Sequence, residues 1–180
     1  MEGSRDEDCD ERGSMTAPGT LLPAMSLVSI ASGEPVDLRA AKGPQALVTL
    51  HSVTCRDCRR YVRERLARGA REIAEWGGRL TIVVPDVRAN AATFAETTTD
   101  ALEIVLDPEG AFDSGHAGVV IADEWGEVHF MADAGAGHDL PSPEEVVEWV
   151  RFLAIQCPEC EGPEGEWRTT ELPRTRPGGP

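Results

Sequence analysis

The sequence has few features that would direct it to nucleic acid, to a membrane or to export. Lys42 is the only lysine, and 17 basic residues stand against 32 acidic ones, which gives a formal net charge of -15. A chain this acidic is repelled by nucleic acid and by anionic membrane surfaces. No apolar run approaches the roughly 18 residues of a membrane span, and the N-terminus is acidic where a signal peptide would be basic and then apolar. We therefore expect a cytoplasmic protein with no membrane span and no nucleic-acid partner.

The chain has five cysteines in 180 residues, and a cytoplasmic setting keeps thiols reduced. The five are therefore predicted to serve redox chemistry or metal binding. Residues 1–23 have almost nothing apolar to bury, so we expect a disordered acidic arm. Cys9, within it, is an incidental thiol, a further metal ligand or a mixed-disulfide partner. The rest divides into one domain over residues 24–156 and an extended tail, 157–180, that starts with a second cysteine pair.

The stretch from Leu47 to Arg63 carries the strongest chemical signal. An apolar run leads into Cys55-Arg56-Asp57-Cys58, after which helical periodicity begins, so the two cysteines are predicted at a strand-to-helix turn. A thiol at the first turn of a helix is close to unpaired backbone N-H groups and to the positive end of the helix dipole, and both favour the thiolate. Three neighbouring arginines add positive charge, whereas Asp57 opposes it. By itself the spacing of the pair also fits half of a zinc site.

Hydrophobic patterning predicts an α/β domain. Ser142, Pro143 and Glu145 form a helix start, as N-cap, first helical residue and capping-box partner. A strand, a helix and a buried strand around the first cysteines predict a right-handed βαβ unit with the cysteines at its crossover. Strands are expected at 27–30, 36–38, 46–51, 80–84, 103–106, 119–122 and 128–131, and helices from the cysteines to Gly77, near 89–96, and from 143 to before Pro158.

Four local motifs stand out: Gly33-x-x-Val36-x-Leu38, the strand leading to Cys55 and Cys58, Val105-Leu106-Asp107-Pro108-x-Gly110, and Ile121-Ala122-Asp123-x-x-Gly126-x-Val128. Together with the order of elements they resemble the thioredoxin-like superfamily, and within it the redoxin branch of alkyl hydroperoxide reductase and thiol-specific antioxidant relatives. The resemblance covers roughly residues 27–155 and implies a central mixed β-sheet flanked by helices, with an N-terminal β-hairpin. It also implies that Cys55 is the attacking thiol and Cys58 the resolving thiol, with no organic cofactor required.

Three features differ from the family pattern. Ala117 stands where these proteins usually carry a cis-proline opposite the cysteines, and a trans peptide is expected there. Thr49 stands where thioredoxins have a buried carboxylate. Peroxide-reducing members need proline and then threonine or serine at seven and three residues before their cysteine, where this chain has Val48 and Ser52. These departures favour a role without catalysis.

Two histidines are candidate catalytic residues beside the cysteines. His51 ends the strand before them and is the nearest group that could exchange protons with Cys55, although a histidine bonded to backbone is at least as common there. His116 would lie across the groove from Cys55 if the resemblance holds, where its ring would stabilise a thiolate. A purely structural environment can also shift the pKa of a histidine, so a catalytic and a structural role remain open for each of the two.

The second pair, Cys157 and Cys160, resembles a zinc knuckle, but one knuckle supplies only two of four ligands. In a thioredoxin-like fold the last helix runs away from the first cysteines, and about thirteen residues at 1.5 Å each carry the chain roughly 20 Å off. A shared four-cysteine site is therefore not expected. Three readings remain for this pair: a second redox dithiol, a zinc half-site completed by another subunit or by Cys9, and a disulfide that fixes the tail.

Two functional hypotheses follow. In the first, the protein is a thiol-disulfide oxidoreductase in which Cys55 attacks a disulfide of a protein or small molecule and Cys58 resolves the mixed disulfide. In the second, it is a non-catalytic thioredoxin-like subunit or assembly factor of a larger complex, such as a metalloenzyme, with Cys157 and Cys160 binding metal or docking a partner. Both predict a protein partner, and both leave the choice between homo- and hetero-oligomer open.

Overall fold

A seven-stranded mixed sheet forms the centre of the computed structural model, which describes residues 17–85, 88–98, 102–108, 110, 112, 117–135 and 139–156. The spatial order of the strands is β2-β1-β5-β4-β3-β6-β7. Strands β3, β4 and β5 are parallel, whereas β6, β7, β1 and β2 each pair antiparallel with a neighbour. The strands are β1 (Leu27–Ser29), β2 (Pro35–Val36), β3 (Gln45–Thr49), β4 (Arg79–Val84), β5 (Glu103–Leu106), β6 (Gly118–Ala122) and β7 (Val128–Asp133).

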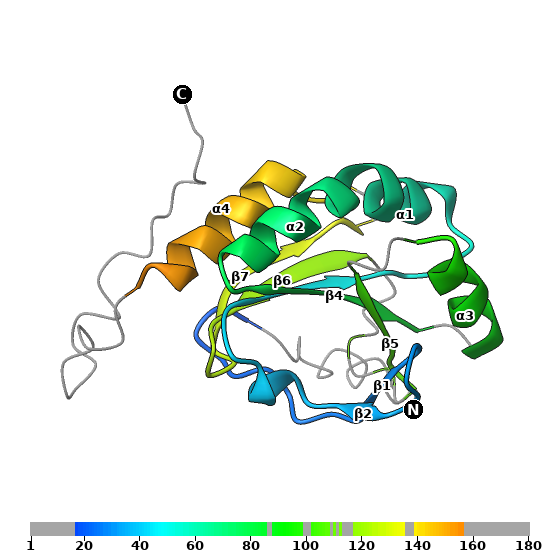
Figure 1. Cartoon of the computed structure of the whole chain (residues 1–180), viewed down its shortest axis with the longest axis horizontal. Coiled ribbons are helices and arrows are strands. Elements are labelled where there is room, and N and C mark those ends of the chain that lie inside the picture. The colour runs from blue at the N-terminus through cyan, green and yellow to red at the C-terminus, as the bar shows by residue number, and fades with distance from the viewer. Residues whose placement is uncertain are drawn as a thin grey trace, which may run out of the picture.

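The described α-helices gather on one face of this sheet (Figure 1). Alternate residues of β3 divide between the two faces, with Val48 in the core under the helices and Leu47 in a second apolar cluster on the other face. That second cluster is closed by the chain before β3, chiefly Leu22, Leu27 and Leu38. The helices are α1 (Arg56–Arg60), α2 (Ala67–Glu75), α3 (Arg88–Glu96) and α4 (Pro143–Ala154), with a π-helical segment η2 (Tyr61–Leu66) and a 3-10 turn η1 (Leu38–Ala40).

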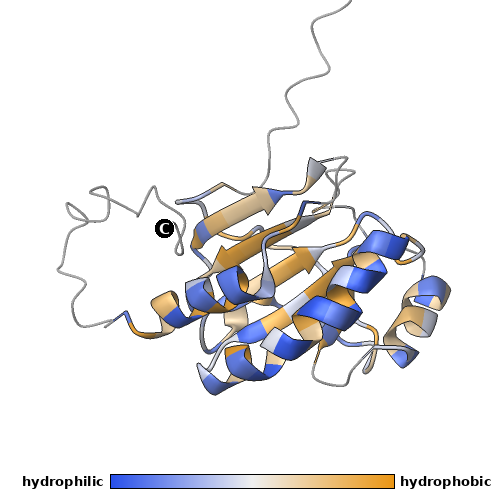
Figure 2. Cartoon of the chain, turned by 90° about the horizontal axis from the view of Figure 1, so that it is seen from above, coloured by the Kyte–Doolittle hydropathy of each residue, from blue (hydrophilic) through white to orange (hydrophobic). Residues whose placement is uncertain are grey.

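The strands are largely apolar and the helices carry polar and apolar residues on different sides, as the hydropathy colours of Figure 2 show. This pattern agrees with the predicted α/β fold class. Both faces of β3 and β4 are buried, which explains their uninterrupted apolar sequences. Ser142 accepts a hydrogen bond at its side-chain oxygen from the Glu145 backbone N-H, 3.1 Å away, so the predicted start of α4 is confirmed.

The helix that follows the cysteines runs from residue 56 to residue 75, with a π-helical segment in its middle. Four of its seven buried residues, Cys58, Val62, Leu66 and Ala70, follow one another at intervals of four. In an α-helix each such step rotates the side chain by about 40° around the axis, so the stripe would drift off the core. The wider π turn keeps these positions on one face. The sequence predicted the helix but not this widening.

The N-terminal region differs from the sequence prediction at two places. Residues 17–23, which composition assigned to the disordered arm, pair with the β6–β7 turn: the Leu22 N-H donates to the Gly126 carbonyl at 2.7 Å, and Leu22 is fully buried. The arm's residues 1–16 lie outside the described part of the chain. The predicted hairpin is present as β1 and β2, but Leu38 begins η1 because the Asp37 side chain accepts the Arg39 N-H and caps a helical turn.

Candidate active site

Cys55 and Cys58 lie at the strand-to-helix turn where they were predicted. Cys55 is the N-cap of α1, with extended backbone angles, and its carbonyl accepts the Arg59 N-H at 3.0 Å. Cys58 follows in the first helical turn and is fully buried, whereas Cys55 is half-buried. Residues three apart at a helix start share one face. The pair therefore has one thiol within reach of solvent and one beneath it.

The loop before the cysteines is fixed by backbone and side-chain contacts. The Leu50 N-H donates to the Val83 carbonyl, which extends the pairing of β3 with β4, and Val53 is buried in the core. Ser52 and Thr54 share a hydrogen bond between their hydroxyl oxygens at 2.8 Å, and the Ser52 oxygen also accepts the Thr54 N-H. This short turn determines where Cys55 enters the helix.

His51 lies beside the buried thiol. Its Nδ1 is 3.4 Å from the Cys58 sulfur, and one ring nitrogen of His51 and both cysteine sulfurs lie within 4.8 Å of one another. The sequence placed His51 near Cys55 as a proton-exchange group. The structure adds a direct contact with Cys58, the buried thiol of the pair.

The electrostatics distinguish the two sulfurs. Burial raises the pKa of Cys58 from 9.0 to about 12, and the neighbouring Cys55 adds to the rise through repulsion and through a hydrogen bond. Backbone hydrogen bonds at His51 and Ser52 lower it, but by less. Cys58 therefore keeps its proton at neutral pH and is a hydrogen-bond donor toward Cys55.

Charged residues surround the exposed side of the pair. The Asp57 carboxylate, expected to oppose a thiolate, lies 3.2 Å from Arg60 and 3.8 Å from Arg56, so its charge is partly compensated. The Arg56 side chain is 90% exposed. The neighbourhood of Cys55 is thus positive in a chain that is strongly acidic as a whole.

Tyr61 connects the cysteine helix to the start of α4. The phenol is buried and its hydroxyl donates to the Pro141 carbonyl at 2.8 Å. Burial raises the pKa of Tyr61, so the ring stays neutral. The sequence analysis did not single out Tyr61. It is the only tyrosine in the chain, and its position one turn beyond Cys58 was the available signal.

Four histidine and cysteine residues that the sequence analysis singled out fall outside the described part of the chain. His116, Cys157 and Cys160 lie outside the described residues, as does Cys9. Ala117, at the position of the family's cis-proline, is buried, and its carbonyl accepts the Ala134 N-H. Thr49, in place of the thioredoxin carboxylate, is buried at the end of β3. The roles given to these residues stay predictions.

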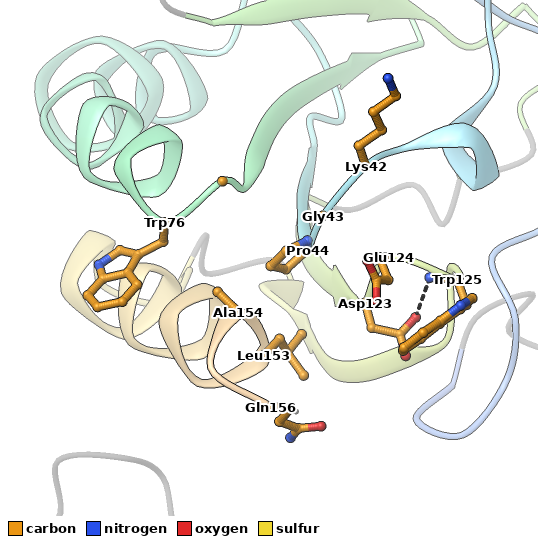
Figure 3. Close-up of a pocket in the computed structure, with 11 residues that line it drawn as sticks. Lys42, Gly43, Pro44, Trp76, Asp123, Glu124, Trp125, Leu153, Ala154 and Gln156 are labelled. Atoms are coloured by element: carbon orange, nitrogen blue, oxygen red, sulfur yellow. Dashed lines mark hydrogen bonds between the residues drawn. The ribbon is translucent and has the colours of Figure 1, made fainter. Parts of the chain in front are cut away.

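A separate hollow of about 230 Å³ lies at the other end of β3 (Figure 3). Pro44 precedes β3 there, while Trp76 and Leu153 come from the ends of α2 and α4. Gln156, the last residue described, also lines it. The last described residue therefore lies at the end of the sheet opposite Cys55, and α4 runs away from the first cysteines as the sequence analysis expected.

No helix in the described part of the chain is long and apolar enough to cross a membrane. Neither a protein-family model nor a curated protein sequence matches the chain.

Solved structures do match, and several of them are peroxiredoxins by name. Peroxidoxin BcpB from Mycobacterium tuberculosis gives a TM-score of 0.64 at 16% sequence identity, over 78% of this chain and 98% of that one. A peroxiredoxin-like protein from Aquifex aeolicus gives a TM-score of 0.63 at 18% identity, over 77% of this chain and 88% of that one. The bacterioferritin comigratory protein of Xanthomonas campestris gives a TM-score of 0.61 at 16% identity, over 72% of this chain and 92% of that one. The chain thus has the α/β, thioredoxin-like fold predicted from its sequence, and in structure it is similar to the peroxiredoxins of the redoxin branch.

Proposed function

We propose that this protein is a thiol-disulfide oxidoreductase in which Cys55 attacks and Cys58 resolves. The observation that carries the proposal is the arrangement of the pair, with a half-buried thiol at the helix N-cap and a fully buried thiol three residues later. The Cys55 thiolate attacks one sulfur of a partner disulfide and releases the other as a thiolate. Cys58 then attacks the Cys55 sulfur, which forms the Cys55–Cys58 disulfide and releases the second partner thiol. The partner gains the two electrons that the pair loses.

His51 has a role in the second of these steps. Cys58 must lose its proton before it can attack, and its raised pKa of about 12 makes that costly at neutral pH. The Nδ1 of His51, 3.4 Å from this sulfur, is placed to take the proton as the Cys58–Cys55 bond forms. His51 is therefore proposed as the general base of resolution.

The charge around Cys55 indicates the class of partner. The helix from residue 56 to residue 75 carries seven arginines and four acidic residues, although the whole chain has a net charge of -15. Arg56, Arg59 and Arg60 are exposed and belong to the first turns beside Cys55. A positive surface attracts anions and raises their rate of encounter. The favoured partner is a disulfide flanked by acidic groups, in a polypeptide or in a small anionic thiol.

The proposal is tested by trapping the mixed disulfide. In a chain with serine at positions 9, 157 and 160, oxidised glutathione serves as the anionic probe. Cys58→Ser should retain glutathione on Cys55, whereas the parent should pass through this species to the internal disulfide. His51→Gln should slow the second step and leave the first unchanged. The absence of any adduct on Cys55 in the Cys58→Ser chain would exclude Cys55 as the attacking thiol.

Peroxide is a second class of oxidant, because solved peroxiredoxins share this fold and Ser52 supplies one of the two residues expected before a peroxidatic cysteine, although Val48 replaces the proline. In this reaction the Cys55 thiolate would attack one peroxide oxygen, the O–O bond would break, and the other oxygen would leave as water, so that Cys55 becomes a sulfenic acid. Cys58 would then attack the Cys55 sulfur and release the sulfenic oxygen as a second water, which forms the same disulfide. The Ser52 hydroxyl is already bonded to Thr54, which lowers its availability. Stopped-flow measurement of hydrogen peroxide consumption distinguishes peroxide reduction from disulfide exchange. A rate constant no larger than that of a free thiol would leave disulfide exchange as the function.

A further inference from the structure

The donor atoms of His51, Cys55 and Cys58 converge on one point of the structure. One ring nitrogen and two sulfurs lie within 4.8 Å of one another, and the Nδ1 of His51 is 3.4 Å from the Cys58 sulfur. The three residues come from a single stretch of eight, His51 directly after β3 and the cysteines at the start of α1. We infer that this cluster, when its thiols are reduced, binds one zinc ion with two thiolates and one imidazole.

The distances suit tetrahedral zinc. Bonds of about 2.3 Å to sulfur and about 2.0–2.1 Å to nitrogen place two ligand atoms of a tetrahedron roughly 3.5–3.8 Å apart. The contact of 3.4 Å between His51 and Cys58 already has this length, and the largest separation of 4.8 Å requires a closure of about 1 Å. A half-buried Cys55 side chain at a helix N-cap can supply that movement by a change of rotamer.

The chemistry of the donors selects the metal. Two thiolates and a neutral imidazole suit zinc, whereas Mg²⁺ and Ca²⁺ prefer oxygen ligands. The two negative charges balance Zn²⁺, so the bound site is neutral. That neutrality matters because Cys58 is fully buried and an uncompensated charge there would be costly.

The fourth coordination position faces outward. No further histidine, cysteine or carboxylate among the residues that the structure describes joins the cluster, and His51 and Cys55 are only half-buried. Three protein ligands with an open fourth position characterise reactive rather than structural zinc sites. Water or an external thiolate would complete the coordination.

Zinc and the internal disulfide exclude each other. A Cys55–Cys58 disulfide removes both thiolates, so only the reduced chain can hold the ion, and a bound ion blocks Cys55 from attacking a partner. The zinc site itself needs only reduced thiols and stands without exchange activity. The regulatory consequence, zinc as an inhibitor of the reduced site, rests on the proposed function.

The test uses the full-length chain with serine at positions 9, 157 and 160, so that its only thiols are Cys55 and Cys58. Zinc is titrated against a chromophoric chelator, and cobalt is added in parallel as a spectroscopic probe. We expect one equivalent of zinc per reduced chain, none after oxidation to the disulfide, and a cobalt spectrum with thiolate charge-transfer bands and tetrahedral d-d bands. Failure of the reduced chain to compete with the chelator, or a cobalt spectrum without thiolate bands, would overturn the inference.

His51 distinguishes a three-ligand site from a simple dithiol. His51→Gln should weaken zinc binding by at least about tenfold, since loss of even an outer-shell partner costs about 10–100-fold. The matched control is His129→Gln, which removes a histidine on β7 that pairs with Asp123. An unchanged affinity in His51→Gln would overturn the three-ligand assignment. Glutathione trapping performed with a chelator present tests the proposed function independently, so failure of one does not imply failure of the other.

Discussion

The contrast between the two cysteines predicts that a thiol reagent labels Cys55 and spares Cys58 in the folded, reduced chain. At pH 8 a thiol with a pKa of about 12 is ionised to about one part in 10⁴, whereas an ordinary cysteine near 8.5 is about a quarter ionised. The fraction of thiolate at Cys58 is therefore lower by roughly 2,000-fold. A more basic thiolate is also more nucleophilic, with a Brønsted slope of about 0.4–0.5, which recovers about 30- to 50-fold.

The net expectation is that Cys58 reacts roughly 50-fold more slowly than an ordinary cysteine, and more slowly still because its side chain is fully buried. The rate at Cys58 should rise about tenfold for each pH unit up to about pH 11, while that of an ordinary thiol levels off above pH 9. The raised pKa comes first from burial, so most of the protection should persist after Cys55 is labelled.

The assay is brief exposure to iodoacetamide, followed by digestion and mass spectrometry of the two cysteine-bearing positions. The same chain unfolded in urea is the control, because both thiols should then react alike. Cys58→Ala, which keeps the site apolar, should leave the labelling of Cys55 in place. Comparable initial rates at Cys55 and Cys58 in the folded chain would refute the assignment of Cys58 as the protected, resolving thiol.

Three further predictions concern stability and partner choice. Tyr61→Phe removes the bond to the Pro141 carbonyl and should lower the free energy of unfolding by about 1–2 kcal/mol in urea titrations; a change within error would contradict the link. Burial raises the pKa of Asp123, but hydrogen bonds from His129 and two backbone N-H groups outweigh it and lower the pKa overall. Asp123 therefore stabilises the fold above its unfolded pKa of about 3.9, and this contribution is lost as the pH falls through its folded pKa. In Asp123→Asn the free energy of unfolding should vary less with pH below about 4. An unchanged slope of the free energy of unfolding against pH would contradict this role. Arg59→Glu should lower the rate ratio for acidic over neutral peptide disulfides about three- to tenfold at low salt, with no difference at high salt; a ratio independent of salt would contradict an electrostatic role.

Much of the fold was predictable because single segments specify it. The buried runs of β3 and β4, the N-cap at Ser142 and the turn before β7 are local signals, and the structure confirms the elements they indicate. Leu22 was missed because its burial depends on the β6–β7 turn, which is more than 100 residues away in the chain. A short apolar pair in a polar stretch carries no periodicity by which to recognise such a contact.

In the candidate site, too, local sequence signals predicted the positions of residues but not their contacts with other segments. The spacing of Cys55 and Cys58 before a helical pattern placed both thiols correctly at the helix start. Spacing alone could not show that His51 would contact Cys58, because the path of the intervening loop depends on the bond from Leu50 to Val83 and on the burial of Val53. The buried positions of the helix after the cysteines, which include Tyr61 and Ile73, have the mixed three- and four-residue spacing of an ordinary amphipathic α-helix, so this pattern did not predict the π-helical segment.

Cys55 and Cys58 are proposed to form a reversible redox pair. Equilibrating the chain in buffers with different ratios of reduced to oxidised glutathione tests this directly. The chain with serine at positions 9, 157 and 160 is quenched with acid and analysed by mass spectrometry. We expect a single transition in which both thiols are lost together as one intramolecular disulfide, reversed fully by excess reduced glutathione. Thiols that persist at every ratio, or glutathione that accumulates on both cysteines without closure of the disulfide, would contradict the account.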